Sequence, residues 1–259
     1  MYNKRQNSRG FSLVELSIVL VILGLLVGGI LGGQSLIHAA ELRSVNTELE
    51  TWRTAVNTFR SRYFQLPGDF TKAEDFWGAA STCPATLGSV VDDGVCNGNG
   101  NGQIGNQAGG YIPERFMFWL ELSKAGLIPG KYSGAAGAEN IYRTNIGTNV
   151  PASKYNGTGW SIFWWNDLAA GDGNWFAGDY GNAHIIGAQS TNSVSSAAFP
   201  PEDAWNIDTK YDDGKPGQGM MVVRLWNSCT LADDNEDFEA EYDLSKDSVE
   251  CALVFRKLY

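Results

Sequence analysis

The chain has 259 residues, a hydrophobic content of 43% and a charged content of 19%, which are ordinary for a globular protein and fit one large domain or two small ones. Its formal net charge is −10 at pH 7, so a phosphate-binding surface, which needs clustered basic residues, is not expected. We therefore expect no nucleic-acid partner, and a role in DNA uptake by direct binding is disfavoured.

The chain begins with a polar, basic segment, residues 1–10, which an apolar run from Phe11 to Gly33 follows. A run of this length is enough for a helix to cross a hydrocarbon core of about 30 Å. Glu15 breaks the apolar pattern, at a cost of about 2.5–3.5 kcal/mol on insertion scales, so it is expected to have a function and a partner. A secretory signal peptide is the alternative for this segment, but Gly-Gly-Gln-Ser from Gly32 is a poor cleavage site.

The sequence R-G-F-S-L-V-E-L, which begins at Arg9, resembles the processing site of type IV prepilins and of the pseudopilins of type II secretion. The resemblance implies that a prepilin peptidase cleaves between Gly10 and Phe11 and methylates the new terminus at Phe11. Glu15 falls at the glutamate position of the family. The implied function is that of a subunit held in the inner membrane, from which an assembly platform extracts it into a filament of its own copies and related subunits.

Cleavage would create an ammonium group on Phe11, beside a helix N-terminus that is already partly positive. Glu15 would supply the opposite charge. The two residues lie one turn apart, so the pair can form within one helix. The resemblance favours instead a pair between Glu15 and Phe11 of a neighbouring subunit, which would set the axial register. Lys4, Arg5 and Arg9 favour a cytoplasmic N-terminus, with the C-terminal part outside the inner membrane.

Glycine recurs every four residues in the apolar run, at Gly24, Gly28 and Gly32, which forms a face that permits close approach of helices. Helix flexibility is the alternative reason for these glycines. The helix should continue as an amphipathic helix, because apolar residues follow with spacings of three and four. These residues are Leu42, Val45, Leu49, Trp52, Val56, Phe59 and Tyr63. A free coiled coil is possible, but the resemblance favours packing on a sheet of the same chain.

We therefore expect four segments: a cytoplasmic leader over residues 1–10, a transmembrane helix over 11–33, an amphipathic extension over 34–65 and a head over 66–259. Pro67-Gly68 should end the long helix, and residues 113–126 predict a short one. The predicted strands are Trp160–Trp165, His184–Ala188, Met220–Leu225 and Cys251–Arg256. The fold class is α+β, with a pilin-like head built on an antiparallel sheet. The segments LPGD, NGNGNG-x-I, E-x-x-x-F-W-x-x-L and DDGKPGQG resemble parts of larger pilin-like proteins.

The four cysteines, placed behind a membrane anchor, suggest an oxidising compartment. They can pair in three ways. We favour the pairing that is local in the sequence, Cys83–Cys96 and Cys229–Cys251, in which each disulfide closes a short loop.

Calcium is a candidate ligand of the loop NGNGNGQI, where Asn97, Asn99 and Asn101 follow the spacing of an EF-hand. The three side chains are neutral and Ala108 occupies the position of the usual glutamate, so a cluster of Asn-Gly turns is the alternative. Two acidic groups are further candidate calcium ligands. The alternatives are that the first group forms a turn and that the second lies in a solvated loop. The two groups are Asp208, Asp212 and Asp213, and the stretch of Asp233, Asp234, Glu236, Asp237, Glu239, Glu241 and Asp243.

An enzyme is not expected, because the two histidines, His38 and His184, suggest no catalytic group and no known catalytic or nucleotide-binding motif occurs. Aromatic residues are dense between Trp160 and Phe176. They predict a sheet core, and a glycan-binding site of a filament-borne adhesin is the alternative. The expected function is a structural subunit of a type IV pilus or, alternatively, a major or minor pseudopilin of a type II secretion system.

Overall fold

The computed structural model describes residues 12–81, 83, 94–105 and 114–259. The contacts within it divide the chain into two compact units, Met1–Glu41 and Leu42–Tyr259. Gly10 and Phe11, which carry the predicted cleavage, lie outside the described residues, as do Ala108 and Pro113.

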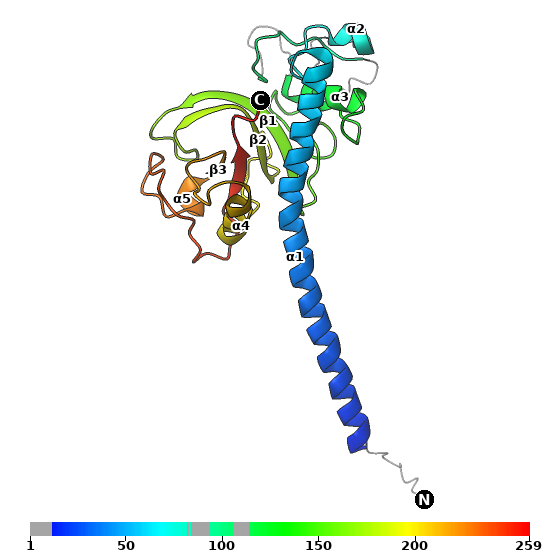
Figure 1. The fold of residues 1–259 in the computed structure, drawn as a ribbon, viewed down its shortest axis with the longest axis vertical. Coiled ribbons are helices and arrows are strands. Elements are labelled where there is room, and N and C mark those ends of the chain that lie inside the picture. Colours follow the sequence, from blue (N-terminus) through cyan, green and yellow to red (C-terminus); the bar gives the residue numbers. More distant parts are fainter. Residues whose placement is uncertain (1–11, 82, 84–93, 106–113) are drawn as a thin grey trace, which may run out of the picture. The chain divides into compact units, whose positions relative to one another are not determined.

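Helix α1 runs without interruption from Leu13 to Tyr63 (Figure 1). A capping box begins it: the backbone N–H of Ser12 donates to Glu15 Oε2 at 2.8 Å, and the N–H of Val14 donates to Ser12 Oγ at 3.3 Å. The helix ends where Phe64 adopts a left-handed φ of 60°, three residues before the predicted stop at Pro67. The membrane-spanning and amphipathic segments expected from the sequence therefore belong to one helix.

The part of α1 in the first unit is apolar and exposed. Its most apolar 18-residue window has a mean hydropathy of 2.6 and contains no buried residue, and by length and composition the helix can cross a membrane. Large side chains from Leu13 to Ile37 are more than half exposed. Such a surface is unstable in water and requires lipid or other apolar helices around it.

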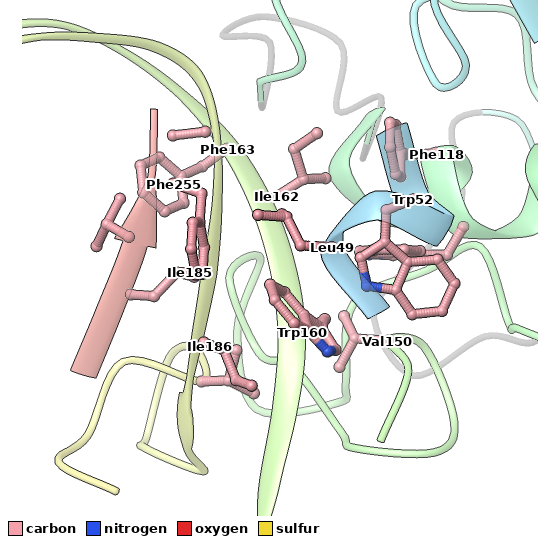
Figure 2. Packing of buried hydrophobic residues seen from close by; sticks show 14 of the residues in the cluster. Leu49, Trp52, Phe118, Val150, Trp160, Ile162, Phe163, Ile185, Ile186 and Phe255 are labelled. Carbon is pink, nitrogen blue, oxygen red and sulfur yellow. The ribbon is translucent and has the colours of Figure 1, made fainter. Parts of the chain in front are cut away.

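The part of α1 in the second unit buries the predicted apolar stripe. Leu42, Val45, Leu49, Val56 and Phe59 are all buried. Figure 2 shows Leu49 and Trp52 beside Trp160 of the sheet, and the rings of Trp52 and Trp160 meet edge to face with centroids 6.5 Å apart. This segment therefore packs on the sheet of its own chain, as the α+β prediction requires.

The sheet is antiparallel with the strand order β1-β2-β4-β3, so β1 is an edge strand. All four predicted strands occur, and the first two are longer than predicted. Their bounds are Thr158–Leu168 for β1, Gly178–Ala188 for β2, Met221–Arg224 for β3 and Ala252–Phe255 for β4.

The register assigns side chains to two faces, because alternate residues of a strand point in opposite directions. Trp160 pairs with Ile186, so these two residues share the face on which α1 packs. Ser161 pairs with Ile185, which places Phe163, two residues further along β1, on the opposite face. Arg224 of β3 lies on this opposite face as well, since its neighbour two residues away, Val222, is in register with Val254 and Ile185.

Within the described residues, four short helices complete the fold: α2 over Ala73–Trp77, α3 over Glu114–Lys124, α4 over Pro201–Tyr211 and α5 over Trp226–Cys229. Helix α3 agrees with the predicted helix over residues 113–126, and α4 was not predicted. The head also contains the disulfides Cys83–Cys96 and Cys229–Cys251, with Cα–Cα distances of 5.6 and 5.0 Å. This is the sequence-local pairing.

Candidate functional site

Glu15 lies in the first turn of α1, and its exposed carboxylate accepts the hydrogen bond of Ser12 that closes the capping box. A carboxylate at this position also interacts favourably with the positive end of the helix dipole. Glu15 therefore has a role within its own helix, besides any role between subunits. Because Phe11 lies outside the described residues, the predicted pair between its amine and Glu15 stays a prediction.

Gly24, Gly28 and Gly32 have no contact within the described chain that requires glycine. A Cβ atom placed on any of them meets no other atom within 4 Å. Glycine inside a helix costs about 1 kcal/mol relative to alanine. A packing role for these glycines would therefore concern a surface outside this chain, as in the small-residue faces of membrane helices.

The NGNGNG loop wraps around two carboxylates of the head. The N–H groups of Gly100 and Gly102 donate to Asp69 at 2.6 and 2.7 Å. Glu114 accepts from the side chain of Asn99 at 2.7 Å and from the N–H of Gly105 at 3.0 Å. The segments LPGD, NGNGNG and E-x-x-x-F-W, which lie apart in the sequence, thus form one hydrogen-bonded structure.

The asparagine oxygens of this loop accept backbone hydrogen bonds. Asn99 Oδ1 accepts from the N–H of Asn101, and Asn101 Oδ1 accepts from the N–H of Gln103, both at 2.8 Å. These two bonds are those of an Asn-Gly turn cluster, the alternative to an EF-hand. Asn97 Oδ1 accepts from the N–H of Glu74 at 3.0 Å, which joins the loop to α2. Calcium at Asn97, Asn99 and Asn101 stays a prediction.

Burial changes the protonation of the acids around the loop. It raises the pKa of Glu114 to about 7 and raises the pKa of Asp69, against the hydrogen bonds that both accept. It also raises the pKa of Glu121 well above its usual value, although Glu121 Oε2 accepts from the N–H of Gly68 at 2.7 Å. Sequence reasoning missed these three acids as a group; the resemblance of LPGD and E-x-x-x-F-W to other pilin-like proteins was the available signal.

The structure brings Asp208, Asp212 and Asp213 together at the end of α4, where one oxygen from each lies within 4.8 Å of the others. Asp208 is fully buried and accepts from the hydroxyl of Tyr242 at 2.8 Å, and burial raises its pKa to about 8. Asp212 accepts from the N–H groups of Met220 and Met221, as a turn former does. Three carboxylates this close together are a candidate cation site.

The second acidic stretch, from Asp233 to Asp243, makes local contacts. Asp234 Oδ1 accepts from the N–H of Glu236 at 2.9 Å, and Asp243 pairs with Lys246 at 3.5 Å. Calcium at this stretch stays a prediction.

The two histidines belong to different units of the chain. His38 is an exposed residue of α1. His184 lies in the core of the head, where its Nε2 is 2.7 Å from the hydroxyl oxygen of Tyr259, and burial lowers its pKa to about 3. A neutral histidine held in this way is a structural residue.

A pocket of about 560 Å³ lies along the edge strand β1 in the head. Phe163, Trp165 and Trp175 line it together with Arg115 and Arg224. The aromatic stretch therefore has two parts. Trp160 and Phe176 are fully buried in the core, as the sheet-core prediction has it, whereas Trp164 and Trp165 are partly exposed to the pocket.

The sequence model of one family, described as the prokaryotic N-terminal methylation motif, matches residues 5–31. The match spans the predicted cleavage site, Glu15 and the start of the apolar helix, and it confirms the resemblance drawn from the residues after Arg9. No curated protein and no solved structure matches the chain significantly. Together with the long apolar helix, the motif is that of a type IV pilin or pseudopilin, a family of structural subunits that a prepilin peptidase processes.

Proposed function

We propose that this chain, a member of the type IV pilin and pseudopilin family, is cleaved between Gly10 and Phe11 and then assembles through α1 into a type IV pilus or a related filament. Before assembly the subunit is held in the inner membrane by the apolar part of α1, with its N-terminus in the cytoplasm and its head outside. The two disulfides of the head suit an oxidising compartment of this kind.

One observation carries the proposal: the first unit of the chain offers an apolar helical surface that nothing in the described chain covers. Burial of apolar area is the main favourable term in association, so this surface is stable only in lipid or among similar helices. A subunit that moves from the bilayer into a bundle of helices keeps this apolar surface away from water in both environments.

In this proposal, Glu15 makes assembly into the helix bundle specific. A carboxylate is costly inside an apolar bundle unless an opposite charge pairs with it. The amine that cleavage creates on Phe11 of a neighbouring subunit is the charge of suitable sign and position. Cleavage and assembly would then be coupled, because only a processed neighbour offers this partner.

The test separates this intersubunit role from helix capping. Glu15→Ala removes the charge and the cap, whereas Glu15→Gln removes the charge but keeps a side chain that completes a capping box. Both variants should insert into the membrane and be cleaved normally, and both should lose most filament assembly, measured as sheared fibre by immunoblot. If Glu15→Gln assembles as well as the wild type, the charge pair is not the reason for Glu15.

The pseudopilin of a type II secretion system is the alternative, and a deletion strain distinguishes the two. Loss of surface fibres with normal secretion would support a pilus subunit. Loss of secreted enzymes from the medium with surface fibres intact would support a pseudopilin. The neighbouring genes also distinguish the two. Genes for a retraction motor and an adhesin would indicate a pilus, and genes for a secretin and a secretion ATPase would indicate a secretion system.

A further inference from the structure

The pocket along β1 has the size and position of a ligand site. Its volume of about 560 Å³ falls within the usual range for small-molecule pockets, roughly 300–1,000 Å³. Phe163, Ile185 and Arg224, which line it, all belong to the sheet face opposite the one that carries Trp160 and packs on α1. The described lining contains no residue of α1, so a ligand in the pocket would not contact the long helix.

Aromatic rings form one rigid wall of the pocket. The rings of Trp165 and Trp175 meet edge to face with centroids 4.3 Å apart, and the centroid of Phe163 lies 4.2 Å from that of Trp165. Phe163 and Trp175 are buried, so they hold Trp165, which stays partly exposed. A flat, fixed indole suits the apolar C–H face of a sugar ring. Because the fold already orders this side chain, ligand binding loses little side-chain entropy.

A guanidinium group of the pocket lining packs on this wall. Arg224 extends over the ring of Trp175, with its Cζ 5.3 Å from the ring centroid, and one of its terminal nitrogens donates to the backbone carbonyl of Ser195. Its Nε is buried and makes no hydrogen bond within the described part of the chain. No carboxylate of the described residues forms an ion pair with Arg224. A buried N–H of a cation without an acceptor is costly, and a carboxylate is the acceptor that fits it best.

The charge of the lining differs from that of the whole protein. The chain has a net charge of −10, yet the lining contains Arg115 and Arg224 and, as an acid, Glu114. The carboxylate of Glu114 is turned to the loop, since it accepts from Asn99 and from the N–H of Gly105. The pocket is therefore a positive site in an acidic protein, which favours an anionic ligand.

From this arrangement we propose that the pocket binds a saccharide that carries a carboxylate, with the sugar ring stacked on Trp165 and the carboxylate held by Arg224. The amide side chains of Asn101 and Gln103, which also line the pocket, supply hydrogen-bond partners for sugar hydroxyls. Two sources provide this chemistry: sialylated glycans and polymers of uronic acids. A pilin-type subunit with such a site would bind acidic glycans along its filament.

The test is calorimetric titration of the full-length protein in detergent micelles. The acidic probes are sialyllactose and trigalacturonic acid, which represent the two sources. Lactose and the methyl esters of the two acidic probes are the neutral controls. We expect at least one acidic probe to bind about tenfold or more tightly than its neutral counterpart, as a charged hydrogen bond requires. The acidic probe that binds identifies the source. Equal affinity for acidic and neutral probes, or no binding of either acidic probe, would overturn the proposal.

Variants then assign the binding to the pocket. Arg224→Gln should weaken binding of the acidic probe by about tenfold or more, whereas Arg53→Gln, which removes the same charge from a partly exposed residue of α1, should not. Trp165→Leu should weaken binding, whereas Trp205→Leu, an exposed tryptophan of α4 that does not line the pocket, should not. The ester control needs no variant, so the proposal stays testable if Arg224→Gln fails to fold. Unchanged binding by a folded Arg224→Gln variant would refute it.

Discussion

The indole N–H of Trp160 donates a hydrogen bond to the carboxylate of Glu48 at 2.7 Å, and so joins β1 to α1 inside the head. The same carboxylate accepts from the hydroxyl of Ser153 at 2.7 Å and from the N–H of Lys154 at 2.8 Å. Glu48 is only 8% exposed, yet it stands in the face of α1 that the sheet covers. Three donors satisfy its charge, which makes it a specific attachment point between helix and sheet.

Replacement of Glu48 by alanine should lower the free energy of unfolding by about 2–4 kcal/mol, because it leaves the buried indole N–H of Trp160 and the partly buried donors of Ser153 and Lys154 without their acceptor. Glu48→Gln keeps an acceptor oxygen and should cost less. Urea unfolding of the full-length protein in detergent, followed by tryptophan fluorescence, measures both. An alanine variant as stable as the wild type would show that water replaces the carboxylate at no cost.

The stability of the head should fall as the pH rises from about 4 to about 8. The folded pKa of Asp208 is about 8 and that of Glu114 about 7, against ordinary values of 3.8 and 4.5. In this window the unfolded chain has lost protons that the folded chain keeps, so deprotonation favours unfolding. Asp208→Asn should flatten this slope. His184, with its pKa lowered to about 3, acts in the opposite sense and destabilises the fold as the pH falls below 6.5.

Thermal melts of the wild type and of Asp208→Asn between pH 4 and pH 9 check this prediction. Asp247→Asn, at an exposed position, is the matched control and should follow the wild type. A wild-type melting temperature that is independent of pH between 5 and 8 would contradict the assigned protonation of Asp208 and Glu114.

Calcium should raise the melting temperature at pH 8, where Asp208 loses its proton and a cation can bind between the carboxylates of Asp208, Asp212 and Asp213. The comparison is between a chelator and about millimolar calcium. If the response arises at the end of α4, Asp213→Asn abolishes it and Asn101→Ala keeps it. If it arises at the NGNGNG loop, Asn101→Ala abolishes the response and Asp213→Asn keeps it. Equal melting temperatures of the wild type in both buffers would remove the metal hypothesis at every candidate group.

The parts of the fold that the sequence predicts are those whose residues follow a short, regular pattern. The apolar stripe from Leu42 to Tyr63 has the period of a helix and is the surface that packs on the sheet. The strands were recognised from apolar runs, although β2 starts six residues before its predicted start at His184, because Gly178, Asp179 and Gly181 do not read as strand residues. Helix α4 was missed because PEDAWNIDTKY is polar; Pro201 at its start and Glu202 and Asp203 in its first turn were the available signal.

The pocket could not be predicted because its lining is brought together only by the tertiary fold. Arg115, Trp165 and Arg224 lie far apart in the sequence, on α3, β1 and β3, and nothing in their neighbours indicates that they meet. The surroundings of Asp69 could not be predicted either, because the loop around Gly100 that encloses it lies more than thirty residues further along the sequence. Composition had shown dense aromatic residues after Trp160, but only the sheet register separates those in the core from those at the pocket.

The glycines at 24, 28, 29, 32 and 33 place the weakest helix-forming residues of α1 in one ten-residue stretch, none of which is buried within the described part of the chain. In a fibre under tension, the backbone hydrogen bonds of this stretch would open before those of the head, whose disulfides and core resist extension. The rod would lengthen there and shorten again when the load is removed. Glycines predicted to let neighbouring helices approach closely would thus also make the fibre elastic.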